Sequence, residues 1–172
     1  MNATAALLTK DELPTPEYVA QLAALLTAKG WMLATAESCT GGLIAGACTE
    51  RPGSSQWLDC GLVTYSNRAK SALLDVPAAL IAEHGAVSEP VARAMAQGAI
   101  AQSHAQVSVA VTGVAGPDGG TPAKPVGTVW FGWQVAGQVL SEVMRFDGDR
   151  HAIRQATVNH ALRRLVEHLS AL

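Results

Sequence analysis

Hydrophobic positions in the first half of the chain alternate between helical spacing and short continuous runs. The first helical pattern follows Pro16 and stops before Gly30, and its apolar members are Val19, Leu22, Ala23 and Leu26. Short apolar runs predict strands over about 32–36 and 58–65, with a helix over about 41–50 between them. Strands that alternate with helices are typical of an α/β protein.

The second half of the chain adds further helices and then a pair of strands joined by a short turn. The remaining predicted elements are helices over about 68–74, 77–83 and 149–169, a helix that begins after Ser88, and strands over about 107–111, 127–135 and 138–146. Ala136 and Gly137 join the last two strands as a hairpin. We therefore predict a three-layer α/β/α sandwich with a mixed, mostly parallel sheet and a late antiparallel hairpin.

The length and composition of the chain predict one domain and argue against several classes of protein. The chain has 172 residues, enough for a single domain over 15–172, and the aperiodic stretch 1–14 predicts a loose N-terminal arm. No apolar run approaches the ~20 residues that span a bilayer, and the first residues lack the pattern of a signal peptide. We expect a cytoplasmic protein with no membrane contact.

The cysteines and the charge argue against further kinds of site and partner. Cys39, Cys48 and Cys60 are odd in number and have no CxxC spacing, which argues against a disulfide framework and a zinc site. The formal net charge is −2 without a basic run, so nucleic acid is not expected as a partner. An anionic ligand must therefore be held by a few local groups.

Polar and glycine-rich segments follow three of the predicted strands. They are residues 37–42, 64–70 and 112–120, and the last of them is a long glycine-rich loop. Ligands of open α/β sheets bind beyond the carboxyl ends of the strands. We therefore predict that these three segments form one site.

Ser38 is the candidate nucleophile of this site, and Lys70 is the candidate base. A serine hydroxyl needs a neighbouring base, and the histidines fall at a helix end or on helices that are predicted to be solvated. If Asn67 caps its helix, Lys70 lies in the first turn, where the dipole favours a neutral amine. A base for neutral pH needs a pKa roughly 3 units below the ~10.4 of free lysine, and burial must supply what the dipole does not. Tyr65 is expected to relay a proton or to position the serine.

Other residues of these segments are candidates for binding or for an alternative nucleophile. Gly41 and Gly42 let the backbone approach a ligand and leave amides free for an oxyanion. Thr112 and Gly113 are expected to form a second wall of the site. Cys39 is a rival nucleophile, because a thiolate beside a helix N-terminus has a lowered pKa.

Arg150 is the candidate partner of an anionic ligand. It lies in the first turn of the last predicted helix, where the dipole opposes a cation. A bound phosphate would resolve this conflict, and a salt bridge to Asp147 or Glu142 would do so equally well. The residues alone therefore support either a serine amidohydrolase or a phosphate-binding domain.

Six segments of the chain together resemble the CinA C-terminal domain family. They are AESCTGG (36–42), VTYSN (63–67) with Lys70, HGAVS (84–88), GVAGP (113–117), KPVGTV (124–129) and GDR (148–150). The resemblance runs in order from about Val19 to the end of the chain. It implies a three-layer α/β/α fold, a homo-oligomer with a dimer favoured, and no metal or other cofactor.

The resemblance also implies an activity and roles for the candidate residues. Stand-alone members of the family hydrolyse the carboxamide of nicotinamide mononucleotide, a pyridine nucleotide, to nicotinic acid mononucleotide and ammonia. Ser38 would be the acylated nucleophile, Lys70 its base and Tyr65 an assisting group. Thr112 would line the pocket, and Arg150 would face the nucleotide phosphate. Two alternatives stay open: a non-catalytic nucleotide-binding module, and a regulatory module connected with competence or DNA damage.

Overall fold

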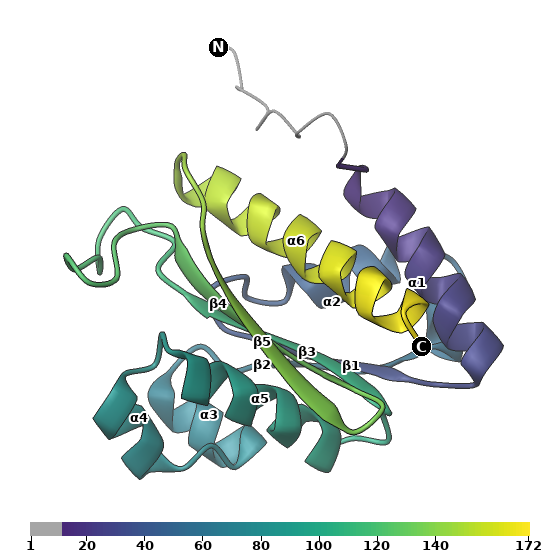
Figure 1. The fold of residues 1–172 in the computed structure, drawn as a ribbon, viewed down its shortest axis with the longest axis horizontal. Helices are drawn as coiled ribbons and strands as arrows, with labels where there is room; N and C mark the ends of the chain where they lie inside the picture. Colours follow the sequence, from purple (N-terminus) through teal and green to yellow (C-terminus); the bar gives the residue numbers. More distant parts are fainter. Residues whose placement is uncertain (1–11) are drawn as a thin grey trace.

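A five-stranded sheet lies between two layers of helices. The computed structural model describes residues 12–172. Its elements are α1 (Thr15–Lys29), β1 (Leu33–Glu37), α2 (Leu43–Thr49), η1 (Ser54–Gln56), β2 (Leu58–Val63), α3 (Asn67–Leu74), α4 (Ala78–His84), α5 (Glu89–Ala101), β3 (Val107–Gly113), β4 (Thr128–Val135), β5 (Gln138–Arg145) and α6 (Arg150–Ser170). Helices α1, α2 and α6 cover one face of the sheet and α3, α4 and α5 cover the other (Figure 1). The predicted three-layer α/β/α sandwich is therefore confirmed.

The strand order of the sheet explains why distant polar segments meet. The order is β2-β1-β3-β4-β5; β1 pairs in parallel with β2 and β3, whereas β4 is antiparallel to β3 and β5. Four strands thus run in one direction and only β4 runs in the opposite direction. This arrangement confirms the predicted mixed, mostly parallel sheet with a late hairpin. Glu37 at the end of β1 pairs with Val63 and with Val111. The segments that follow β1, β2 and β3 therefore start side by side, beyond the carboxyl ends of these strands.

Two apolar clusters hold the helical layers onto the sheet. The cluster under α1, α2 and α6 includes Leu22, Leu26, Phe131 and Leu162, and that under α3, α4 and α5 includes Leu74, Val91, Met95 and Ala110. β3 contributes to both because both of its faces are covered, as is usual for a central strand of an α/β sheet. None of the helices in residues 12–172 combines the length and apolarity that a bilayer crossing requires.

Helix termini differ from the prediction where backbone geometry or a neighbouring cap decides them. α2 begins at Leu43 because Gly41 and Gly42 adopt left-handed backbone, with φ of 60° and 100°. Of the two residues that can cap α3 by sequence, Ser66 and Asn67, it is Ser66 that does so, since its hydroxyl accepts a hydrogen bond from the Ala69 amide. Lys70 still lies in the first turns of that helix.

The start of the chain is described only in part. Residues 1–11, most of the predicted loose arm, lie outside the described residues. The Leu13 amide donates to the Tyr18 hydroxyl, and Leu13 packs against the core. Pro14 is the N-cap of α1, and the Thr15 hydroxyl donates to Asn159.

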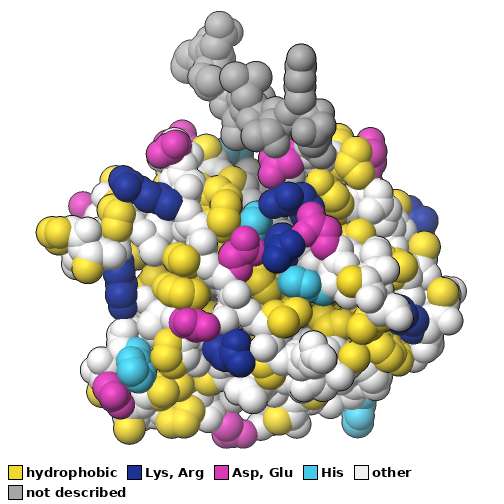
Figure 2. Space-filling model, viewed as in Figure 1, with side chains coloured by type: hydrophobic (Ala, Val, Ile, Leu, Met, Phe, Trp, Pro, Cys, Tyr) yellow, Lys and Arg dark blue, Asp and Glu magenta, His cyan; other side chains and the backbone are white. Residues whose placement is uncertain are grey.

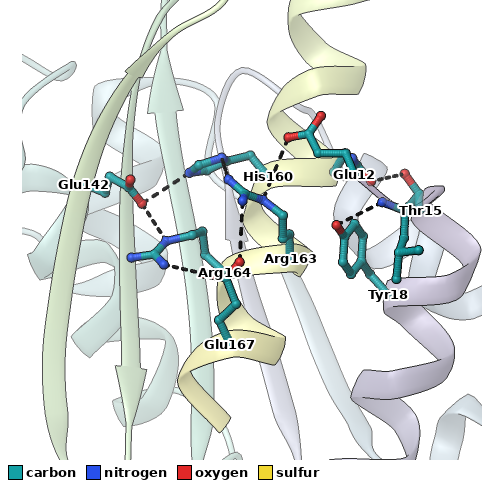
Figure 3. Close-up of polar contacts among 10 residues, drawn as sticks. Glu12, Thr15, Tyr18, Glu142, His160, Arg163, Arg164 and Glu167 are labelled. Atoms are coloured by element: carbon teal, nitrogen blue, oxygen red, sulfur yellow. Dashed lines mark hydrogen bonds and ion pairs between the residues drawn. The ribbon is translucent and has the colours of Figure 1, made fainter. Parts of the chain in front are cut away.

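His160 lies on a helix that the sequence analysis predicted to be solvated, but in the structure this residue is only 4% exposed. Its ring contacts Phe131 and Phe146 on one side and polar groups on the other. Nε2 lies 3.2 Å from a Glu142 carboxylate oxygen, and Arg163 donates to Nδ1 at 3.2 Å (Figure 3). Because Arg163 occupies Nδ1, a neutral His160 carries its proton on Nε2 and donates it to Glu142.

Acidification below pH 6.5 is expected to lower the stability of the fold through His160. Burial lowers the pKa of His160 below its ordinary 6.5, although Glu142 opposes this shift. Below that pH the unfolded chain binds a proton that the folded chain does not, so the free energy of unfolding falls as pH falls. His160→Gln should therefore reduce the slope of the melting temperature against pH between 7 and 5. The exposed His151→Gln serves as the control, and an equal slope in the two variants would contradict the assignment.

Candidate active site

The amine of Lys70 and the hydroxyl of Ser38 meet beyond the carboxyl ends of β1 and β2. Ser38 directly follows β1, and its amide donates to the Val111 carbonyl at 3.1 Å. Lys70 Nζ lies 2.9 Å from Ser38 Oγ and donates to the Thr64 carbonyl, also at 2.9 Å. The Ser38 residue is 8% exposed and Lys70 only 1%. The predicted nucleophile and base are therefore within hydrogen-bond distance.

The surroundings of Lys70 favour its neutral form. Burial is the largest influence and lowers the pKa of this amine below its ordinary 10.5, while the neighbouring Cys39 acts weakly in the opposite direction. Lys70 takes part in no salt bridge within residues 12–172. A neutral amine beside a serine hydroxyl can accept its proton, which is the condition for a nucleophilic serine.

Cys39 is a weaker candidate nucleophile than Ser38. It follows Ser38 in the same turn, but burial raises the pKa of its thiol to about 11. The thiol therefore stays protonated at neutral pH, in contrast to the lowered pKa expected from the sequence. In addition, the amine of Lys70, the candidate base, makes its hydrogen bond to the Ser38 hydroxyl and not to the Cys39 thiol.

The amides of Gly41 and Gly42 already have acceptors within the chain. Gly41 donates to the Ser38 carbonyl at 3.1 Å, and Gly42 donates to the Glu37 carboxylate at 3.1 Å. This geometry corrects the expectation that these two amides would stabilise an oxyanion. The amides of Cys39 and Thr40, in the same turn, donate to no other residue in the described part of the chain, so they are the better donor candidates.

A pocket of about 240 Å³ opens beside Ser38 and Lys70. Its lining consists of Ser38, Cys39, Tyr65, Asn67, Lys70, Ala86, Val87, Thr112, Gly113, Ala115 and Arg150. Six of the eight predicted site residues are in this lining, and Gly41 and Gly42 are not. A larger hollow of about 640 Å³ between α3, α4 and α5 contains none of the eight, so size alone does not identify the site.

Tyr65 and Arg150 lie together in the lining of this pocket. Tyr65 is 62% exposed, and its hydroxyl accepts a hydrogen bond from Arg150 at 3.2 Å. Arg150 also donates to the Gly116 carbonyl at 2.8 Å, and since these are its two hydrogen bonds within residues 12–172, the remaining ones of its five N–H groups are available there for an anion. Within residues 12–172, the Tyr65 hydroxyl is thus hydrogen-bonded to Arg150 and not to Ser38 or Lys70. This contact favours a positioning role for Tyr65 over a proton relay. Thr112 lies deeper, where its hydroxyl donates to the Ala86 carbonyl.

Arg154 is a site residue that the sequence analysis missed. Its guanidinium donates to the Cys39 carbonyl at 3.1 Å and to the Thr40 carbonyl at 2.9 Å, which fixes the turn after Ser38. The available signal was its position four residues after Arg150, because this spacing places both arginines on one face of α6.

The distribution of charge and of metal-binding side chains argues against two other kinds of site, a basic surface for nucleic acid and a metal site. On the face shown in Figure 2, Lys and Arg side chains lie among Asp and Glu and form no continuous basic surface. In residues 12–172, no three His, Cys, Asp or Glu side chains are grouped so that they could hold a metal ion. The polar side chains of the pocket are instead three hydroxyls, a thiol, a carboxamide, a buried amine and one guanidinium.

Comparisons with solved structures support the fold across nearly the whole chain. A CinA superfamily protein from Klebsiella pneumoniae has a TM-score of 0.89 and 40% identity, and the match covers 93% of this chain and 100% of that one. The competence/damage inducible protein CihA from Agrobacterium tumefaciens has a TM-score of 0.87 and 46% identity, with 94% and 98% covered.

Sequence relatives fall into two groups by length. Nicotinamide-nucleotide amidohydrolase PncC of Pseudomonas putida is 57% identical over 133 residues, covering 77% of this chain and 83% of the relative. The enzyme of the same name from Enterobacter agglomerans is 53% identical, with 83% and 88% covered. The chain spans only about a third of longer relatives, such as a CinA-like protein of Mycolicibacterium gilvum at 52% identity, with 87% and 35% covered. The family model of the CinA C-terminal domain matches residues 16–169, and the chain belongs to this family.

Proposed function

We propose that this protein is a nicotinamide-nucleotide amidohydrolase that converts nicotinamide mononucleotide and water into nicotinic acid mononucleotide and ammonia. The observation that carries the proposal is the 2.9 Å contact inside a pocket between a serine hydroxyl and a buried amine that has no salt-bridge partner in residues 12–172. Two relatives that bear the name of this activity match the chain over more than four fifths of their own length.

The proposed reaction proceeds through an acyl-enzyme on Ser38. Neutral Lys70 takes the Ser38 proton while Oγ attacks the amide carbon, and the amides of Cys39 and Thr40 donate to the developing oxyanion. Protonated Lys70 then gives its proton to the leaving nitrogen as the C–N bond breaks. Water attacks the ester next, with Lys70 again as the base; the bond between the acyl carbon and Ser38 Oγ then breaks, Lys70 returns the proton to Oγ, and nicotinic acid mononucleotide leaves. A positioned base of this kind contributes about 10²–10⁴-fold in rate.

The size of the pocket suggests how the nucleotide is oriented. Its volume of about 240 Å³ is below the roughly 300–1,000 Å³ of pockets that enclose whole drug-sized ligands. We therefore place the pyridine ring and carboxamide beside Ser38 and the phosphate outside, at the free N–H groups of Arg150. The dimeric state and the cytoplasmic location stay predictions.

Ammonia release from nicotinamide mononucleotide and from its riboside, which lacks the phosphate, tests this placement. Arg150→Ala is expected to raise KM for the nucleotide about 10–100-fold, since a hydrogen bond to a charged group is worth about 1.5–3 kcal/mol. KM for the riboside should not change. The control is Arg51→Ala, which removes the same charge from an exposed loop.

Two outcomes would contradict the proposal. If Arg150→Ala weakens the nucleotide and the riboside equally, the phosphate does not lie at Arg150. If the nucleotide binds saturably and no ammonia is released, the protein is a non-catalytic nucleotide-binding module.

A further inference from the structure

The carboxylate of Glu37 is fully buried and accepts hydrogen bonds from five donors. Oε1 accepts from the Thr35 hydroxyl at 3.0 Å and from the Ala45 amide at 2.8 Å. Oε2 accepts from the Thr40 hydroxyl at 2.6 Å and from the amides of Gly42 and Ile44 at 3.1 and 3.0 Å. All five of these groups donate, so the two carboxylate oxygens act only as acceptors.

These donors lie on both sides of Ser38 in the chain. Thr35 belongs to β1, Thr40 and Gly42 to the turn after Ser38, and Ile44 and Ala45 to the first turn of α2. α2 has seven residues, fewer than an isolated helix needs for stability, and its first amides lack intrahelical acceptors. The Glu37 carboxylate supplies those acceptors and thereby ties the strand, the turn and the helix together.

The main chain of Glu37 is connected through hydrogen bonds to Lys70, the partner of Ser38 in the active site. Its carbonyl accepts from the Thr64 amide at 2.8 Å, and the Thr64 carbonyl accepts from Lys70 Nζ at 2.9 Å. Glu37 therefore has two contacts with the site. Its side chain fixes the turn that carries Ser38, and its carbonyl fixes the backbone that holds Lys70. Within residues 12–172 Lys70 forms no salt bridge, with Glu37 or with another carboxylate, so no negative partner in this part of the chain holds the proton of the amine.

We propose that Glu37 is the positioning residue of the active site: its buried carboxylate holds Ser38 Oγ within hydrogen-bond distance of Lys70 Nζ. It touches neither the substrate nor the reacting atoms. The inference rests on the proposed function for its kinetic test only, because the reactivity of Ser38 can also be measured without the nucleotide.

Glu37→Gln is the discriminating variant because it keeps the size of the side chain and replaces an acceptor by a donor. The new NH₂ group would face either the Ala45 amide or the amides of Gly42 and Ile44, so the turn must shift. A displacement of about 1 Å costs on the order of 10²-fold in rate. We expect kcat for ammonia release to fall about 10–100-fold, while KM, which reports the pocket and Arg150, stays within about threefold.

Labelling by phenylmethylsulfonyl fluoride gives a second readout that does not depend on the substrate. Ser38 Oγ forms a bond to sulfur, the S–F bond breaks, fluoride leaves and the serine proton passes to Lys70; intact mass reports the rate. Glu37→Gln should lower this rate by about the same factor as kcat. A wild-type protein that is labelled at Ser38 but releases no ammonia would refute the proposed substrate and leave the role of Glu37 open to this measurement. A wild-type protein that is neither labelled nor active would overturn both proposals.

Two further variants separate positioning from general stability. Cys48→Ala removes a buried side chain from the last turn of α2 without removing an acceptor, so it should lower the melting temperature and leave kcat and labelling unchanged. Thr40→Val removes one donor and should lower both rates severalfold; it carries the test if Glu37→Gln does not fold. Wild-type rates in Glu37→Gln or, where that variant is unfolded, in Thr40→Val would overturn the inference. So would an equal loss of rate in Cys48→Ala.

Discussion

Ser38→Ala is expected to lower kcat/KM for ammonia release from nicotinamide mononucleotide by at least about 10³-fold, because it removes the atom that becomes acylated. The loss should appear in kcat, since the hydroxyl is one small part of the pocket lining and Arg150 is untouched. Ser38 is almost fully buried but small, so the variant should keep its circular dichroism spectrum and melting temperature.

Cys39→Ala is the matched control for Ser38→Ala. It keeps the backbone amide that we assign to the oxyanion and removes only the thiol, so most of the activity should remain. Mass spectrometry after brief incubation with the nucleotide should locate an ester on Ser38 whose acyl group is that of nicotinic acid mononucleotide, with the ribose and phosphate still attached. If Ser38→Ala stays active and Cys39→Ala does not, the thiol is the nucleophile and the assignment made from the Lys70 contact is wrong.

Lys70→Met is expected to lower kcat about 10²–10⁴-fold, the contribution of a positioned base. Methionine fills the same buried volume with apolar atoms but accepts no proton. In the wild-type protein, kcat/KM should rise with pH as Lys70 loses its proton, and the inflection should lie below 10.5 because burial lowers the pKa of the amine. This inflection should be absent in Lys70→Met.

Lys70→Arg provides the control for charge at this position. The guanidinium keeps a cation near Ser38 but stays protonated, so this variant should be as inactive as Lys70→Met. Activity in Lys70→Arg, or an unchanged pH inflection in Lys70→Met, would mean that another group removes the Ser38 proton.

The sequence predicted the fold well because the signals that carry it are local. Helical spacing between Pro16 and Gly30 gave α1, and Ala136 with Gly137 gave the turn of the β4–β5 hairpin. The termini were less accurate where a cap or a left-handed glycine decides them, as at Ser66 and Gly42. The burial of His160 was not predicted, because the sequence does not reveal that Arg163 and Glu142 satisfy a polar ring in the interior.

The structure brings six of the eight predicted site residues into the lining of one pocket, whereas the hydrogen-bond partners of several of them differ from the expectation. Ser38 and Lys70 could be paired from the sequence because each follows a strand, and parallel neighbours end at the same edge of a sheet. Gly41 and Gly42 were assigned to an oxyanion because a sequence does not show which amides already have acceptors. Arg154 was missed because its contacts to the turn join residues more than 110 positions apart.

By itself, the sequence determined the turn AESCTGG, the order of strands and helices around it, and the residue types available for chemistry. Only the tertiary structure decided which of those groups lie together and in what surroundings. Desolvation of Lys70, its 2.9 Å approach to Ser38 and the choice of acceptor for each amide all depend on segments far apart in the chain. The pKa of an amine and the direction of a hydroxyl are set by everything packed around them, and that packing exists only once the sheet has assembled.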